Sequence, residues 1–209
     1  MKHEWRKNEK ELYVPPASPV LIQVPEQRFF AIKGKGDPNA EDFAKRIEVL
    51  YSLSYAIRMM PRKGFIPPGY FEYTVYPLEA VWGLTDKGKQ LHALDKNELV
   101  YKLMIRQPDF VDNGTVLKAY ELAGEKKVNE LLNEVVFEEF EEGLTVQLLH
   151  EGPYDDEPAS FGKIDRFLDE KNMQRSNKKH REIYLNDFRK TPPAKLKTVL
   201  RCKVEKIMP

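Results

Sequence analysis

One order of predicted elements occurs twice, and it constrains the fold of this chain more than any other feature. Residues 28–82 follow the order strand, glycine/proline turn, helix, loop, strand, and residues 99–106 add a further strand. Residues 143–204 repeat that order, again ending with two strands. A repeated order of elements is the sequence signature of an internal structural repeat. We therefore expect an α+β fold built from two β-α-β-β modules.

The repeat also predicts where a ligand binds. Each module supplies one helix for three strands, so we expect the helices on one side of the sheet. A cleft at the junction of two modules is a common ligand site. We expect a lead-in over residues 1–17 and a single domain over 18–207. The domain comprises a first module at about 18–110, a helical insertion at about 111–141 and a second module at about 142–207.

Side-chain periodicity predicts the individual elements. Alternating apolar residues are typical of strands, and apolar residues three or four apart are typical of helices. We expect the lead-in to be extended or poorly ordered, and Asp37 or Asn39 to cap the first long helix. The expected strands are 20–24, 28–33, 71–82, 99–106, 143–150, 178–187 and 197–204, and the expected helices are about 39–59, 113–126, 128–140 and 155–172.

The predicted strand 178–187 carries an unusual row of polar side chains. Successive strand residues point to opposite faces, so His180, Glu182 and Tyr184 share one face while Ile183 lies on the other. An imidazole, a carboxylate and a phenol in a row suit proton transfer or cation binding. A solvent-facing strand, with Glu182 paired to a neighbouring basic residue, is the simpler alternative.

Charge and cysteine content narrow the classes of partner. The 209 residues include 34 basic and 33 acidic side chains, so no overall field attracts nucleic acid or an anionic membrane. The one cysteine, Cys202, excludes an intrachain disulfide and is expected to be a small buried residue. The first residues are charged and have no apolar core, so we expect no secretory leader. The sequence has no apolar run of the roughly 20 residues that span a bilayer. We expect a soluble, cytoplasmic protein without nucleic-acid or membrane partners.

No cofactor or metal site is expected from the motifs. The glycines Gly34 and Gly36 do not form the phosphate-binding loop of nucleotide-binding proteins. His180 has no second histidine or cysteine at metal-ligand spacing.

Four motifs together resemble one family. They are Gly-Pro-Tyr at 152–154, His-Arg-Glu-Ile-Tyr-Leu-Asn-Asp at 180–187, the basic tail 189–201, and Tyr-Pro-Leu-Glu-Ala-Val-Trp at 76–82. This combination resembles the GyrI-like small-molecule-binding proteins over roughly residues 15–207, and most of all their stand-alone bacterial members. The resemblance implies two pseudo-twofold-related modules, an antiparallel sheet and a ligand cleft at the module junction.

The resemblance implies two possible functions. Some stand-alone members are similar to hydrolases that open the cyclopropane ring of cyclopropanoid DNA-alkylating agents. Other members are modules that bind lipophilic cations without catalysis and sense or sequester drugs. In the first case Glu182, with a pKa raised by an apolar pocket, is the catalytic base. Tyr184 or Tyr154 then hydrogen-bonds the substrate carbonyl.

The implied ligand is a lipophilic aromatic or cationic small molecule, and further side chains are candidates for the wall of its pocket. Each has a simpler alternative, because large apolar residues often belong to the core and a bulge at Pro77 would turn Glu79 outward. Where typical relatives have two aromatic residues after the corresponding glutamate, this chain has Trp82-Gly83. The candidate ligand-binding residues are Glu79, Trp82, Tyr154, Tyr55, Met104 and Phe110.

A third reading is a protein-binding inhibitor related to gyrase-interacting members, for which the sequence offers no particular surface. We expect no helix-turn-helix before residue 18, since such a motif needs dozens of residues. The sequence leaves the oligomeric state open.

Overall fold

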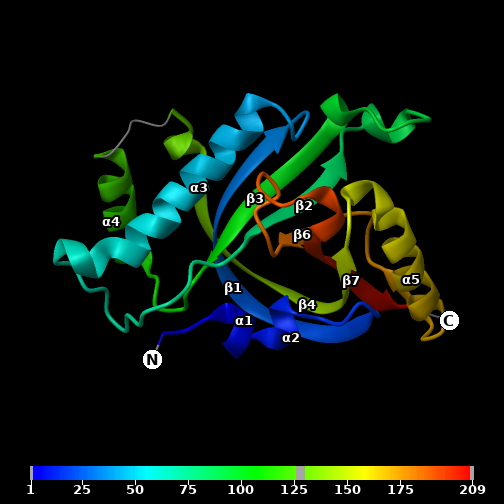
Figure 1. Ribbon diagram of the computed structural model, residues 1–209, viewed down its shortest axis with the longest axis horizontal. Helices are drawn as coiled ribbons and strands as arrows, with labels where there is room; N and C mark the ends of the chain where they lie inside the picture. Colours follow the sequence, from blue (N-terminus) through cyan, green and yellow to red (C-terminus); the bar gives the residue numbers. More distant parts are fainter. Residues whose placement is uncertain (1, 126–129, 208–209) are drawn as a thin grey trace. The chain divides into compact units, whose positions relative to one another are not determined.

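Helices and strands follow one another in the order expected for an α+β protein (Figure 1). The computed structural model describes residues 2–125 and 130–207. The strand pairings described below are antiparallel, in agreement with the predicted class and sheet type. The chain divides into two compact units, the first formed by Met1–Glu4 and Gln27–Phe140 and the second by Trp5–Glu26 and Glu141–Pro209.

The first unit is a sheet with two long helices. Its strands are β1 (Val20–Lys35), β2 (Leu78–Leu84) and β3 (Leu99–Gln107), with β3 paired antiparallel to both others. Helix α3 (Glu41–Met59) lies beside β1 and β3, and α4 (Asn113–Gly124) packs against α3 (Figure 1). The first β-α-β-β order is therefore confirmed.

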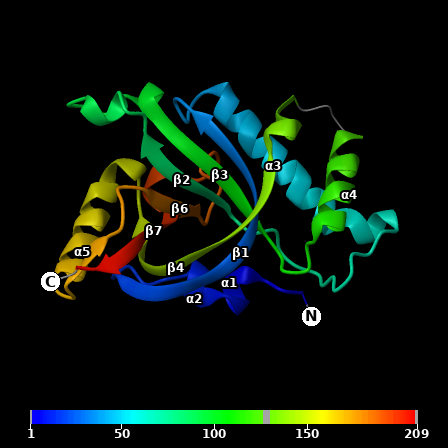
Figure 2. The same cartoon turned by 180° about the vertical axis from the view of Figure 1, so that it is seen from behind.

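The second unit is organised around β7 (Lys197–Lys206). Strands β6 (His180–Tyr184) and β4 (Val136–Glu151) pair with the same residues of β7 from opposite edges, and β5 (Met173–Arg175) pairs with the C-terminal end of β7. Helix α5 (Glu157–Asp169) lies beside these strands, as the reverse view also shows (Figure 2). The second β-α-β-β order is confirmed, with β5 as an additional strand that periodicity did not predict.

An apolar core joins α5 to one face of this second sheet. Ile164 and Leu168 are one turn apart on α5, and both are buried. Burying such a side chain contributes roughly 1.5–3 kcal/mol to stability. Leu200 lies in this core directly opposite Glu182 in the β6–β7 register, so Glu182 points to the face that α5 covers. The core consists of Val146, Leu148, Ile164, Leu168, Met173, Leu200, Cys202 and Val204.

Two buried arginines occupy the opposite face of β6 and β7. Arg181 and Arg201 are partners in the strand register. Arg201 donates from Nε and Nη2 to Gln147 Oε1 at 3.0 and 2.8 Å. Arg181 Nη2 lies 3.3 Å from Glu142 Oε2, and Arg201 also donates to the carbonyl of Leu12. These polar partners make burial of both guanidinium groups tolerable.

The lead-in contains two short helices, so the expectation of an extended or poorly ordered segment is wrong. Trp5 in α1 (Trp5–Asn8) and Tyr13 in α2 (Lys10–Tyr13) are both buried, with ring centroids 5.3 Å apart. Arg6 donates to the carbonyl of Leu185. Contacts with residues far away in the sequence determine this structure, and the polar composition of the segment gives no sign of them.

The helix expected over 128–140 is also wrong. Residues 128 and 129 lie outside the described residues, Glu130–Glu134 is a 3-10 helix, and β4 begins at Val136. Phe140 stacks on Phe29 at 5.0 Å, which shows how pairing with another strand overrides helix propensity. The acidic run at 138–142 therefore belongs to a strand rather than to a helix end.

Three smaller expectations change in the structure. Only the C-terminal part of the strand expected at 71–82 is a strand in the structure. Strand β2 begins at Leu78, directly after Pro77, which has no N–H to donate to a neighbouring strand. The two strands expected at 20–24 and 28–33 are the single strand β1. Helix α3 has Ala40 at its N-cap and no side-chain cap. Among the described residues, no helix is long and apolar enough to cross a membrane.

Candidate functional site

The polar row of β6 is a hydrogen-bonded unit. Tyr184 donates its hydroxyl to Glu182 Oε2 at 2.7 Å, and His180 Nε2 lies 2.9 Å from Glu182 Oε1. Glu182 is buried, with 7% of its surface exposed. Both carboxyl oxygens therefore have a partner from the same strand face, as the alternating pattern predicts. His180 is thus a hydrogen-bond partner of Glu182 and not only its neighbour on the strand face.

A second row, on the segment that leads into α5, covers the first. Tyr154, Glu157 and Phe161 are spaced three and four residues apart, which puts them on one face of a helical segment. The Tyr154 ring meets the Tyr184 ring edge-on at 6.1 Å. The Phe161 ring meets the His180 ring at 4.8 Å. The helical row and the strand row therefore run side by side.

Glu157 lies between those two ring contacts and faces Glu182. The ligand atoms of Glu157, Glu182 and His180 all lie within 4.8 Å of one another. Burial, followed by the negative charge of Glu182, raises the pKa of Glu157 from an ordinary 4.5 to about 9. The carboxyl site is the name used here for Tyr154, Glu157, Phe161, His180, Glu182 and Tyr184.

A tight turn places the helical row. Gly152 has a φ of 128°, which strains any side-chain-bearing residue, and its N–H donates to the Leu196 carbonyl at 3.0 Å. The buried His150 lies 3.0 Å from the Pro153 carbonyl through Nε2 and 2.9 Å from Ser160 Oγ through Nδ1. Because a carbonyl only accepts, Nε2 carries the proton. His150 therefore ties the turn to the first part of α5.

Tyr154 stays a hydrogen-bond donor at neutral pH. Burial raises the pKa of its hydroxyl first, and the charges of Glu182 and Glu157 raise it further. A protonated phenol beside two carboxyl groups can donate to an oxygen atom of a bound molecule.

Comparison with known proteins identifies the family. Residues 17–204 match the GyrI-like small molecule binding domain, which is most of the chain. The chain belongs to the GyrI-like family. The resemblance carried by the four motifs is therefore confirmed. No curated protein sequence matches this GyrI-like chain significantly.

Solved structures support the same family. A structure described as a hydrolase from Listeria innocua is 33% identical, with a TM-score of 0.89, covering 98% of this chain and 100% of that one. A structure described as an uncharacterized conserved protein from Listeria innocua is 34% identical, with a TM-score of 0.90 and the same coverage. The C-terminal domain of EcmrR is 15% identical, with a TM-score of 0.50, over 90% of this chain and 98% of that one, and shares the fold alone.

Three of the residues predicted for the GyrI-like site meet in the structure. Glu182, Tyr184 and Tyr154 all belong to the carboxyl site. The remaining five belong to the first unit. That they line the same site as Glu182 stays a prediction.

The first-unit candidates on strands are largely buried. Glu79 and Met104 are fully buried and are partners in the β2–β3 register, with Met104 packed against Phe29 in an apolar cluster. Trp82 is half-buried, and its ring lies 5.9 Å from Phe43 and meets other aromatic rings of its unit. The core alternative for Met104 therefore has direct support.

Tyr55 and Phe110 lie elsewhere in the first unit. Tyr55 is 53% exposed on α3, with its ring 6.2 Å from that of Tyr51. The Phe110 ring packs edge-on against Phe71 at 5.2 Å and Tyr70 at 5.3 Å. Phe110 thus belongs to an aromatic cluster of its own.

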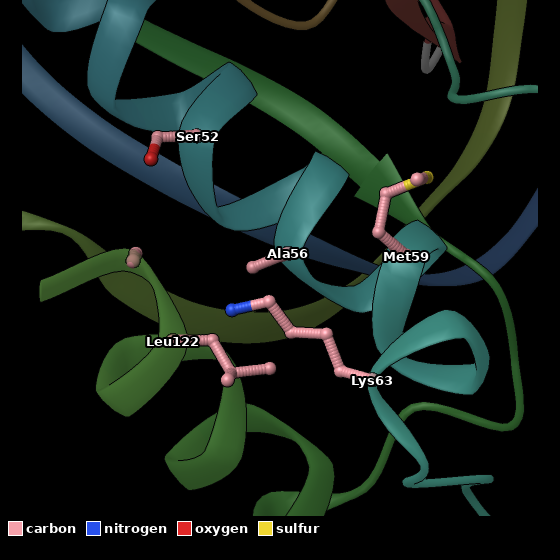
Figure 3. Close-up of a pocket in the computed structure, with 6 residues that line it drawn as sticks. Ser52, Ala56, Met59, Lys63 and Leu122 are labelled. Atoms are coloured by element: carbon pink, nitrogen blue, oxygen red, sulfur yellow. The ribbon is translucent and has the colours of Figure 1, made fainter. Parts of the chain in front are cut away.

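A small surface pocket in the first unit does not have the chemistry of the carboxyl site. It lies between α3 and α4, and no carboxyl or aromatic side chain is among the residues that line it (Figure 3). Carboxyl and aromatic groups are the ones that attract a lipophilic cation. Its lining residues are Ser52, Ala56, Met59, Lys63, Leu122 and Ala123.

Sequence reasoning missed Glu157, although the sequence contains a signal for it. Glu157 occupies one position in a row at three-to-four spacing that continues from Tyr154 through Phe161 to Ile164 and Leu168. A carboxylate inside the apolar stripe of an amphipathic helix is expected to be buried.

Proposed function

We propose that this GyrI-like protein binds lipophilic aromatic molecules and hydrolyses them by opening a cyclopropane ring with water. The carboxyl site supports this proposal through one observation above the others. Glu182 is a buried carboxylate, hydrogen-bonded by Tyr184 and flanked by the rings of Tyr154, Tyr184 and His180. A carboxylate with restricted access to water is a base positioned to act on a bound molecule.

In the proposed reaction, Glu182 removes a proton from water while the water oxygen forms a bond to the cyclopropane carbon. The strained carbon–carbon bond breaks, and its electron pair moves into the conjugated carbonyl of the substrate. The hydroxyl of Tyr154 is a suitable donor to that oxygen, because its raised pKa keeps it protonated. The hydroxyl of Tyr184 is already donated to Glu182 and therefore orients the base.

Incubation with a cyclopropanoid DNA-alkylating agent tests this function. We expect a ring-opened, water-added product, and we expect Glu182→Gln to lower kcat by roughly 10²- to 10⁴-fold. The matched control is Glu170→Gln, an exposed glutamate that directly follows α5. Unchanged hydrolysis by Glu182→Gln would show that Glu182 is not the base.

A second candidate function is binding without turnover. The family itself is described as a small-molecule binding domain, and paired carboxyl groups among aromatic rings favour a lipophilic cation. Tight binding of such a cation without any product from the alkylating agent would support this function. Loss of binding in Glu182→Gln, with binding kept in Glu170→Gln, would assign it to the carboxyl site.

A further inference from the structure

Glu157 is a buried acid with an unfilled hydrogen-bonding position. Only 8% of its surface is exposed, and its Oε1 has no hydrogen-bond partner in the described part of the chain. Its carboxyl group lies within 4.8 Å of the carboxyl group of Glu182. Two carboxylates at this distance in a partly dry site do not both stay ionised at low cost, so the pair holds one proton.

The hydrogen bonds decide which member of the pair holds that proton. Glu182 receives the Tyr184 hydroxyl at Oε2 and has His180 at Oε1, and donors of this kind stabilise the charged form of a carboxyl group. Glu157 Oε1 has no such donor among the described residues. The charge therefore belongs on Glu182 and the proton on Glu157. The raised pKa of Glu157 agrees with this assignment. The titratable groups that face Glu157 are Glu182 and His180 on β6 and Tyr154 at the start of the helical row.

We propose that Glu157 is the general acid of the carboxyl site and donates its proton to the substrate oxygen on which negative charge develops. This inference rests on the proposed hydrolysis and adds a second reacting residue. Glu182 takes one proton from water as the new carbon–oxygen bond forms. The carbon–carbon bond breaks, its electron pair moves to the carbonyl oxygen, and that oxygen takes the proton of Glu157. Substrate and one water molecule become one product.

The closeness of the two carboxyl groups also explains how the site resets. After the reaction Glu182 is protonated and Glu157 is a carboxylate. One proton passing between groups within 4.8 Å, directly or through one water molecule, restores the starting state. No oxidant, reductant or further reactant is needed.

The same three side chains contain the ligand types of a divalent metal site, namely two carboxylate oxygens and an imidazole nitrogen. We favour the shared proton, because His180 Nε2 and the Tyr184 hydroxyl are already hydrogen-bonded to the two oxygens of Glu182. A metal titration distinguishes the shared proton from a bound metal ion. Protein treated with a chelator is titrated with Zn²⁺ and Mn²⁺ by calorimetry, and stoichiometric binding that restores lost activity would overturn the acid role of Glu157.

The direct test is a carboxyl ¹³C titration of protein labelled at glutamate. We expect one resonance with a midpoint near 9 in the wild type and in Glu170→Gln, and its absence in Glu157→Gln. A midpoint of Glu157 in the ordinary range near 4.5 would overturn the proposal whatever the substrate. This readout needs no turnover, so its failure is distinct from failure of the proposed hydrolysis.

Kinetics supply the second readout. We expect Glu157→Gln to lower kcat by about 10²-fold or more with little change in KM, and to remove the alkaline limb of the pH–rate profile. Glu157→Asp, which keeps an acid in the site, should recover part of the activity. A Glu157→Gln protein that folds and keeps wild-type kcat and the alkaline limb would refute the acid role.

Discussion

Replacing Glu182 by Gln should lower the pKa of Glu157, and the distance between the two carboxyl groups sets the size of the change. Two unit charges interact with about 332/(εr) kcal/mol, and an effective ε of about 20 suits partly buried pairs. For groups within 4.8 Å of each other this is at least about 3.5 kcal/mol. One pKa unit is about 1.36 kcal/mol. Because burial is the larger cause of the rise from 4.5 to about 9, the charge of Glu182 accounts for no more than about 2 units.

The variant therefore separates the two causes of the raised pKa. Glu182→Gln removes the neighbouring charge but leaves burial, so the pKa of Glu157 should fall from about 9 by roughly 2 units. The carboxyl ¹³C titration measures this shift, with Glu170→Gln as the control that should show none. A decrease of less than about one unit would mean that the two carboxyl groups do not interact as their distance requires.

Three further predictions concern stability and reactivity. The folded protein keeps a proton on Glu157 that the unfolded chain loses above pH 4.5. The free energy of unfolding should therefore fall as the pH rises from 4.5 to about 9. The loss is up to about 1.4 kcal/mol per pH unit; urea unfolding at pH 5.5 and 8.5 should show this slope in the wild type and not in Glu157→Gln. Arg201→Ala should lower the free energy of unfolding by about 3–5 kcal/mol, because it leaves Gln147 and Glu142 with lost partners; a loss below about 1 kcal/mol in urea unfolding would contradict this. Cys202 is buried and its pKa is raised to about 11, so a thiol reagent should modify it far more slowly in native than in denatured protein; equal rates would mean that the thiol is exposed.

Several features of the fold were predictable because they depend on local periodicity. Alternation along 178–187 predicted a strand with one polar face, and β6 has that face. Three-to-four spacing predicted the helices that became α3, α4 and α5. The repeated order of elements predicted two β-α-β-β modules. In each case the repeat length of the backbone, about 2 or 3.6 residues, is read directly from neighbouring residues.

Predictions failed where distant contacts decide the structure. Local propensity favours the helix expected over 128–140, but Phe137 and Phe140 pack against Phe30 and Phe29 of β1, and the chain is a strand from Val136 onward. The lead-in is polar by composition, yet its buried Trp5 gives it fixed helical structure. A strand can form its hydrogen bonds only with another strand, so its existence depends on residues far away in the sequence.

In the carboxyl site, too, some features follow from local sequence and others only from tertiary structure. The sequence by itself determined that His180, Glu182 and Tyr184 share one face, because side-chain direction along a strand follows from backbone geometry. Only the tertiary structure decided that the start of α5 covers that face and brings Glu157 to Glu182. The charge interaction and the loss of water that raise the pKa of Glu157 act through space. Two glutamates 25 positions apart acquire different proton affinities only when folding brings them together.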